Sequence, residues 1–276
     1  QAVIHLYSGI GQQIRQHKAQ VRVMNYIGID IGSTASKVCV LSEGKDPLYK
    51  VLPTGWNSKI TAGIIREELE QLLGSLDDCR IIATGYGRIS VEYSDKVITE
   101  ISCHGRGGYE LSGSDCSIID VGGQDTKFIQ VENGKAIDFL MNDKCAAGTG
   151  KFIEVMANRL GVTIEELFEL ATIGKPIPIS SLCTVFAESE VINYMGEGKS
   201  REDLAAGVVD SVALKVATLV QRRTLSDKVI ITGGLSGNEF FAKRLSEKLG
   251  KEVLPQKYGR YAGALGAALL AKEKVK

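Results

Sequence analysis

The sequence has no CxxC pair and no long hydrophobic run. Its six cysteines are spread too thinly over 276 residues for a disulfide framework, and this usage is typical of an intracellular protein. No apolar run reaches the roughly 18 residues needed to span a bilayer. The 33 basic side chains balance the 33 acidic ones, so net charge favours neither nucleic acid nor a membrane surface as a partner. We therefore expect a cytoplasmic protein.

The remaining composition, 44% hydrophobic, is that of a globular protein of one large domain or two closely joined ones. Residues 1–23 differ from the rest, because they hold two of the three histidines and a basic cluster of Arg15, His17, Lys18 and Arg22. A strong strand pattern follows directly after Met24. We expect residues 1–23 to be an extension outside the main fold; the alternative is a basic helix that docks on a partner.

An apolar strand pattern that starts at Asn25 ends at Asp30 and is followed by a tight turn. The turn and its flank are made of small and polar residues, Gly32, Ser33, Thr34, Ala35, Ser36 and Lys37. Such a loop can surround phosphate oxygens with N–H groups and hydroxyls while the aspartate holds hydrated Mg²⁺. A plain hairpin turn is the alternative for this motif alone.

The same pattern occurs again at Asp120, after a second apolar strand, and continues with Gly122, Gly123, Gln124 and Asp125. Asn133-Gly134 then predicts a hairpin turn. Two similar half-domains that face one cleft would place two acidic, glycine-rich turns around one phosphate chain. A third apolar strand, 229–231, stops at Gly233 and Gly234, where a flat ligand can approach the backbone closely.

Cys145 and Cys183 each precede an amphipathic helical pattern, so we expect each thiol at or near a helix N-terminus, where the helix dipole favours a thiolate. Two interpretations compete. Both cysteines can be ordinary half-buried residues. Alternatively they bind metal: two ligands cannot fill a four-thiolate iron–sulfur site, but a symmetric dimer would supply four on its twofold axis.

Helical periodicity predicts further helices at 60–73, 94–104, 162–170, 201–223, 240–249 and 263–271, and a short strand at 252–254. Thr163 is a suitable N-cap, with Glu166 three residues later. Cys103 and His104 are adjacent, but neighbours on a helix point about 100° apart, so we do not expect them to share a metal.

The motifs DIGSTASK, DVGGQD and TGG, in this order, resemble the two phosphate motifs and the adenosine motif of the ASKHA superfamily of sugar kinases, actin and heat-shock chaperones. NDKCAAGTG, SSLCTVFAESE, ATGYGR, EISCHGRG and GALGAAL resemble the activators, or component A, of 2-hydroxyacyl-CoA dehydratases. These belong with the ATPase subunits of benzoyl-CoA reductase. The resemblance covers about residues 24–272.

The resemblance implies an α/β fold of two ribonuclease-H-like domains, of the actin and hexokinase type, with a nucleotide cleft between them. We expect these domains at 24–117 and 118–276, with the C-terminal helix in the second domain or packed back on the first. It also implies a homodimer that shares one [4Fe–4S] cluster, held by Cys145 and Cys183 of each subunit. Nothing in it makes the other four cysteines ligands.

The implied function is ATP hydrolysis that drives one-electron transfer at low potential to a 2-hydroxyacyl-CoA dehydratase, with a ferredoxin or flavodoxin as donor. Asp30 and Asp120 would organise Mg²⁺. The Gly32–Lys37 segment and Gly122–Gly123 would hold the phosphates of ATP or ADP, and Gly233 and Gly234 the adenosine. Gln124 would orient the attacking water, a role that other NTPases give to glutamine. Glu188 is the candidate link between nucleotide state and cluster.

Three alternatives remain at this point. The first is a small-molecule kinase of the same fold without iron. The second is the activator of a different iron–sulfur reductase, of the benzoyl-CoA or double-cubane type. The third is a non-catalytic, nucleotide-gated interaction protein in which the cysteines are structural.

Overall fold

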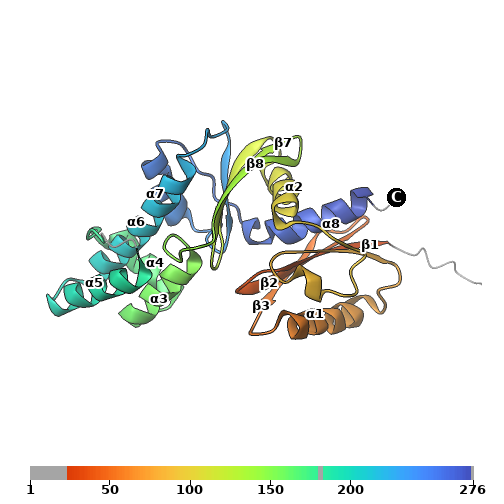
Figure 1. Ribbon diagram of the computed structural model, residues 1–276, viewed down its shortest axis with the longest axis horizontal. Coiled ribbons are helices and arrows are strands. Elements are labelled where there is room, and N and C mark those ends of the chain that lie inside the picture. Colours follow the sequence, from red (N-terminus) through yellow and green to blue (C-terminus); the bar gives the residue numbers. More distant parts are fainter. Residues whose placement is uncertain (1–23, 180–182, 275–276) are drawn as a thin grey trace, which may run out of the picture.

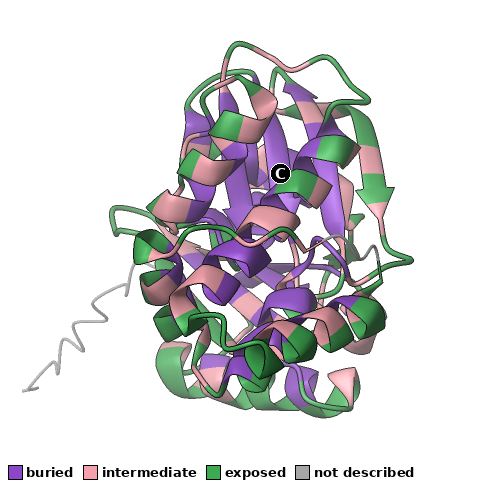
Figure 2. Ribbon diagram, turned by 90° about the vertical axis from the view of Figure 1, so that its left-hand side faces the viewer, coloured by how far each residue is buried: buried purple, intermediate pink, exposed green. Residues whose placement is uncertain are grey.

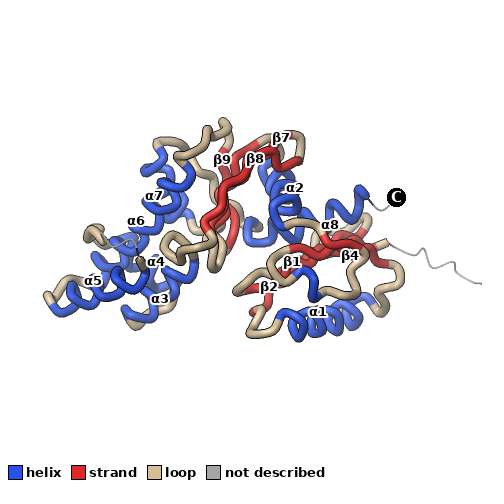
Figure 3. Tube along the Cα trace, in the orientation of Figure 1, coloured by secondary structure: helices blue, strands red, loops and turns tan. Residues whose placement is uncertain are grey.

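The computed structural model describes residues 24–179 and 183–274. Two separate mixed β-sheets are surrounded and joined by helices (Figures 1 and 3). The predicted extension, residues 1–23, and the Ser180–Leu182 part of the second cysteine motif lie outside the described residues. Within the described ranges, no helix combines the length and apolar character that crossing a bilayer requires.

The first sheet has the strand order β3-β2-β1-β4-β5. Its strands are β1 Asn25–Ile31, β2 Ala35–Ser42, β3 Leu48–Pro53, β4 Cys79–Thr84 and β5 Lys96–Val97. β1 pairs antiparallel with β2 and parallel with β4. Helix α1, Ser58–Leu73, packs its apolar residues against this sheet and ends at Gly74, which has a φ of 81°. The helix predicted at 60–73 is therefore confirmed.

The second sheet, β8-β7-β6-β9, repeats this arrangement, with antiparallel pairs β6–β7 and β7–β8 and a parallel pair β6–β9. Its strands are β6 Cys116–Val121, β7 Thr126–Glu132, β8 Lys135–Asn142 and β9 Val229–Gly233. Asn133 and Gly134 connect β7 to β8 with φ values of 49° and 72°. Positive φ at both positions is what a tight hairpin needs, so the predicted turn is confirmed.

Five helices pack on one side of the second sheet and share one apolar core with it (Figure 1). They are α3 Gly150–Leu160, α4 Ile164–Ile173, α5 Thr184–Gly196, α6 Arg201–Val220 and α7 Glu239–Leu249. At the start of α4, the side chains of Thr163 and Glu166 form the predicted capping box. Figure 2 shows buried residues concentrated in the strands and on the helix sides that face them.

Helices α2, Glu100–Ser112, and α8, Ala262–Lys274, cross closely between the two sheets (Figure 1). α8 packs against β1, β2 and β4 of the first sheet, and α2 packs against β7 and β8 of the second. A methyl group on Gly266 would lie 1.7 Å from the Cys103 carbonyl oxygen, so glycine is required at this crossing. The end of the chain thus packs back on the first sheet, while the division after residue 117 stays a prediction.

The helix predicted at 94–104 is wrong in its bounds. Lys96 and Val97 pair with β4 as a short strand, and α2 begins at Glu100 after the N-cap Thr99. It then continues to Ser112 through the glycine-rich stretch 105–108, which has low intrinsic helix propensity. Tight packing against α8 stabilises the helix there. This tertiary contact cannot be predicted from the local sequence pattern. The strand predicted at 252–254 is reduced to a single bridge between Leu254 and Ile230.

Candidate functional site

The two Asp-x-Gly turns meet at the junction of the two sheets. Asp30 lies near the end of β1, and Asp120 near the end of β6. A methyl group added to Gly123 would lie 2.2 Å from Oγ1 of Thr34. The structure therefore brings the first turn into contact with the second, although they are about 90 residues apart in the sequence.

Thr54 fixes the shape of the first turn. Its hydroxyl donates to the Gly32 carbonyl at 2.7 Å, and its N–H donates to the Thr34 carbonyl at 3.0 Å. These bonds occupy carbonyl oxygens of the turn. Amide groups and a nearby ammonium, that of Lys37, are what such a turn offers to an anion.

Asp30 is buried at the base of this turn, with 3% of its surface exposed. One carboxylate oxygen, Oδ2, lies 3.6 Å from Nζ of Lys37. The other, Oδ1, makes no hydrogen bond within the described chain. Gly85 and Gly263 approach the carboxylate so closely that a methyl group would lie 2.3 Å from Oδ1 and 2.9 Å from Oδ2, respectively. A buried oxygen with an open lone pair fits a hydrated cation or an ordered water molecule.

Asp120 has a different environment, because both of its oxygens have partners. Oδ1 accepts a hydrogen bond from Thr232 at 2.9 Å and lies 3.1 Å from Nε2 of His104, while Oδ2 lies 3.3 Å from Nζ of Lys127. Burial alone would raise the pKa of Asp120. The positive charges of His104 and Lys127 outweigh it and hold this pKa well below its usual range.

Lys127 is the centre of a buried ionic network. Its ammonium group lies 2.7 Å from Asp125, 3.0 Å from Glu100 and 3.3 Å from Asp120. Burial opposes its charge, but the three carboxylates raise the pKa of Lys127 above its usual value. Glu100, His104 and Asp120 place ligand atoms within 4.8 Å of one another, as a metal site does, but the ammonium of Lys127 already contacts both carboxylates.

This network is what sequence reasoning missed. Lys127 stands two residues after Asp125 and ends the run DVGGQDTK, yet it lies in a strand of otherwise apolar pattern. His104 is the only histidine between residues 24 and 276. It faces Asp120, while neighbouring Cys103 is buried among Ile82 and residues of α8.

The remaining residues predicted for nucleotide binding line the second turn and the end of β9. The Gly122 N–H donates to the Asp125 carbonyl at 2.9 Å, and Gln124 is exposed. Gly233 has a φ of 86°, and a methyl group on it would lie 2.2 Å from the Val121 carbonyl oxygen. A methyl group on Gly234 would meet no atom within 4 Å. Gly234 thus has open space beside its backbone.

Cys145 and Cys183 are exposed, whereas the other four cysteines are buried. Burial raises the pKa of Cys39 to about 12, so that thiol is a poor ligand. Cys183 is the N-cap of α5, as predicted. Cys145 lies near the start of α3, as predicted: the helix begins at Gly150, after a turn in which the Thr149 hydroxyl donates to the Ala146 carbonyl at 2.7 Å.

The surface beside Cys183 is apolar. Val185 and Phe186 follow it in the first turn of α5 and are 65% and 67% exposed. Glu188, one turn further, forms an ion pair with Arg159 at the end of α3. Two exposed thiols, one of them beside unpartnered apolar side chains, are typical of a surface that meets another molecule.

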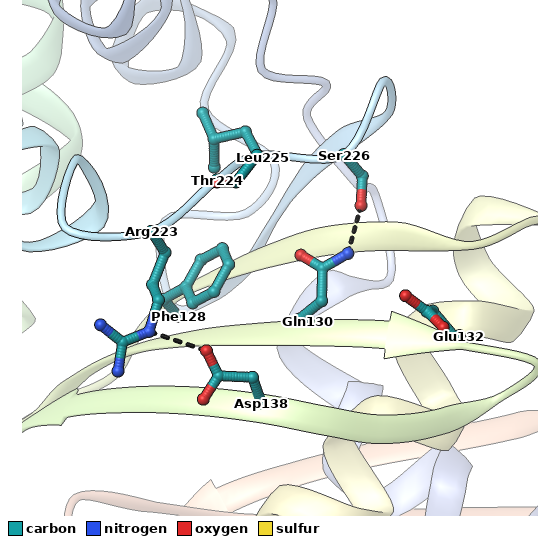
Figure 4. A pocket seen from close by; sticks show the side chains of 8 residues that line it. All are labelled: Phe128, Gln130, Glu132, Asp138, Arg223, Thr224, Leu225 and Ser226. Atoms are coloured by element: carbon teal, nitrogen blue, oxygen red, sulfur yellow. Dashed lines mark hydrogen bonds and ion pairs between the residues drawn. The ribbon is translucent and has the colours of Figure 1, made fainter.

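A cavity of about 430 Å³ lies elsewhere, between β7, β8 and the segment after α6 (Figure 4). Arg223 binds Asp138 there at 2.7 Å, and the Gln130 amide donates to Ser226 at 2.6 Å. None of the residues predicted for nucleotide or metal binding lines it. The cavity therefore adds nothing to the predicted site.

Comparison with known proteins identifies the chain. Residues 27–271 match the model of the BadF/BadG/BcrA/BcrD ATPase family. The chain belongs to this ATPase family. A member from Acidaminococcus fermentans, the activating ATPase of (R)-2-hydroxyglutaryl-CoA dehydratase, is 45% identical over 252 residues, which cover 90% of this chain and 97% of that protein. The predicted family is therefore confirmed.

Solved structures agree with this BadF/BadG/BcrA/BcrD assignment. The activator of 2-hydroxyisocaproyl-CoA dehydratase from Clostridium difficile, with bound ADPNP, is 38% identical and has a TM-score of 0.83 over 91% of this chain and 97% of its own. A glucokinase from Streptomyces griseus shares the fold alone, with 17% identity and a TM-score of 0.57 over 90% of this chain and 99% of its own. The predicted two-domain α/β fold and ATP as the nucleotide are thereby confirmed.

Proposed function

We propose that this chain is an activating ATPase that uses ATP hydrolysis to drive low-potential one-electron transfer to a 2-hydroxyacyl-CoA dehydratase in the cytoplasm. The names of its relatives support this function. The single observation that carries it is the exposure of Cys145 and Cys183, in a chain that buries its other cysteines and carries two phosphate-type turns. Neither a kinase nor a purely structural protein needs two exposed thiols.

The donor set fits an iron–sulfur cluster shared by a homodimer. Cys145 and Cys183 supply two thiolates from each subunit, and four thiolates complete a [4Fe–4S] site. The exposed Val185 and Phe186 beside Cys183 would be covered in such a dimer. The first-turn N–H groups of α5 favour negative charge near Cys183. When bound, the cluster supplies a one-electron carrier of low potential.

For ATP hydrolysis, we assign the contact with hydrated Mg²⁺ to Asp30, whose Oδ1 is unpartnered within the described chain. Both oxygens of Asp120 already have partners. Asp120 would therefore orient the second turn and help Asp30 to hold the hydrated Mg²⁺. The residues Gly32 to Lys37 and Gly122–Gly123 would hold the phosphates.

At the second turn, the exposed Gln124 would orient the attacking water. Gly233 shapes the chain after β9, and Gly234 leaves the space that adenosine would take.

The partner is recognised by its chemistry: an enzyme that must be reduced by one electron at very low potential. A 2-hydroxyacyl-CoA dehydratase is our choice, and a reductase of the benzoyl-CoA type would make the same demand. A ferredoxin or flavodoxin would reduce the cluster again after each transfer, because both carry single electrons at low potential.

The test is to purify the protein without oxygen and to measure iron and sulfide per dimer, with the EPR spectrum of the dithionite-reduced form. We expect about four irons per dimer and a [4Fe–4S] signal that disappears in Cys145→Ala and in Cys183→Ala but remains in the control Cys79→Ala. Protein that holds no iron under these conditions would contradict the proposal, and a screen for kinase substrates would follow.

A further inference from the structure

Helix α3 is bonded at its N-terminus to the second phosphate-type turn. The N–H of Gly150 donates to the Gly122 carbonyl at 2.9 Å, and the N–H of Lys151 donates to the Gly123 carbonyl at 2.8 Å. Amide groups that would otherwise lack partners at a helix start are thus satisfied by the turn itself. A shift of this turn on nucleotide exchange must therefore displace α3.

Helix α3 is short and is packed into the core along its length. Phe152, Ile153, Met156 and Leu160 are buried in the core of the second domain, and an 11-residue helix measures about 16 Å. At its beginning it also holds the turn that contains Cys145, because the N-cap residue Thr149 bonds to Ala146 through both its N–H and its hydroxyl. The N-terminal end of α3 therefore contacts both the Gly122–Gly123 turn and the turn that contains Cys145.

The other end of α3 contacts the helix of the second thiol. Nε of Arg159 donates to Oε1 of Glu188 at 2.8 Å, and a second guanidinium nitrogen contacts the same oxygen. Glu188 lies in the second turn of α5, whose N-cap is Cys183. α5 is weakly anchored, since Ala187 and Val191 are its fully buried residues. The ion pair therefore joins α5 directly to α3, next to the apolar contacts of Ala187 and Val191.

We propose that Arg159 and Glu188 are positioning residues that transmit a displacement of the Gly122–Gly123 turn, through α3, to the helix that begins at Cys183. This rests on the proposed function, in which both thiols hold a cluster. The inference adds the route by which the bound nucleotide changes the surroundings of that cluster. The Arg159–Glu188 contact is then required for coupling between the nucleotide site and the cluster, but not for binding ATP or iron.

The experiment compares the rate at which the reduced dimer loses iron to a chelator in Mg–ADP and in Mg–ADPNP. We expect the wild-type rates to differ between the two nucleotides. Glu188→Gln and Arg159→Gln should reduce this ratio about two- to fivefold, the size of effect that a partly exposed ion pair has on an equilibrium. The charge swap Arg159→Glu with Glu188→Arg should restore it, which a purely structural loss would not allow.

Glu154→Gln is the matched control, because Glu154 pairs with Lys151 at 2.9 Å with similar exposure but entirely within α3. It should leave the ratio unchanged. A second readout needs no iron. It uses the full chain with Cys145→Ala, stripped of iron, and measures the rate at which maleimide labels Cys183. This rate should differ between Mg–ADP and Mg–ADPNP, and Glu188→Gln should reduce the difference.

The outcomes separate the two proposals. If the wild-type protein binds no iron, the proposed function is contradicted. If labelling of Cys183 nevertheless depends on the nucleotide, and Glu188→Gln weakens this dependence, the inference stands. Variants that bind iron and ADPNP like the wild type and retain its full nucleotide response, in both readouts, would overturn the inference and leave the proposed function intact.

Discussion

The ammonium group of Lys127 lies 2.7 Å from a carboxylate oxygen of Asp125, and this contact ties the second phosphate turn to a buried strand. The same nitrogen reaches Glu100, in the first turn of α2, at 3.0 Å. One buried cation thus joins the turn, the sheet and the helix that packs between the sheets. Its removal would leave several carboxylates without their positive partner.

We expect Lys127→Met to lower the free energy of unfolding by about 3–5 kcal/mol, as the loss of one partner of a buried ionic group does. Urea denaturation with matched baselines measures this. Lys151→Met is the control, because Lys151 is exposed and such a change should stay within about 0.5 kcal/mol. Equal stability of the two variants would show that the carboxylates find other partners.

Stability should depend on pH through Asp120 and His104, with opposite signs. The folded pKa of Asp120 is lowered from 3.8, so its contribution is present above this value and lost as pH falls. For His104, burial favours the neutral ring, but the charge of Asp120 outweighs it and raises the pKa above 6.5. That contribution is present below pH 6.5 and lost as pH rises through the folded pKa.

The free energy of unfolding should therefore decrease as pH rises above 6.5 and through the folded pKa of His104 in the wild type, and this decrease should be smaller in His104→Gln. The imidazole resonance of His104 should titrate above 6.5. In Asp120→Asn it should titrate below 6.5, because burial remains while the compensating charge is gone. A pKa of His104 that Asp120→Asn leaves unchanged would contradict this electrostatic account.

The sequence predicted most strands, both Asp-x-Gly turns and most helices, because each depends on periodicity or on turn residues close together in the chain. It did not reveal the ionic network, since Glu100, His104 and Lys127 come together only when α2 packs on the second sheet. The same packing explains the misplaced bounds of α2. The position of Cys145 near the start of α3 was predicted, because helical spacing begins shortly after this cysteine.

Gly233 and Gly234 should respond differently to a single added methyl group. In Gly233→Ala the methyl would lie 2.2 Å from the Val121 carbonyl oxygen at a φ of 86°, so we expect loss of stability by about 1–3 kcal/mol. In Gly234→Ala it meets open space, so the unfolding free energy should hardly change. If adenosine takes that space, ADPNP affinity should fall about tenfold or more, which corresponds to about 1.4 kcal/mol.

Calorimetric titration of each variant with ADPNP, next to thermal unfolding, separates the two effects. Gly237→Ala serves as control, because a methyl group there also meets nothing within 4 Å and Gly237 is not a predicted nucleotide contact. Wild-type ADPNP affinity in Gly234→Ala would remove Gly234 from the nucleotide site.

Gly266 sets how closely α8 can approach α2 between the two sheets. A methyl group on it would lie 1.7 Å from the Cys103 carbonyl oxygen and 2.7 Å from the Gly107 nitrogen, both backbone atoms that cannot rotate away. We expect Gly266→Ala to separate the helices at a cost of about 3 kcal/mol in unfolding free energy. Because these helices join the sheets that carry Asp30 and Asp120, ADPNP affinity should fall as well.

Gly63→Ala on α1 is the matched control, since it too adds a methyl group to a helical glycine but into open space. Because alanine has a higher helix propensity than glycine, Gly63→Ala should raise the free energy of unfolding by about 0.5–1 kcal/mol. Urea denaturation and ADPNP titration of both variants give the result. A Gly266→Ala protein as stable as the wild type would mean that the crossing can widen freely, and the distance between the two turns would then have to be set by the ionic network around Lys127 instead.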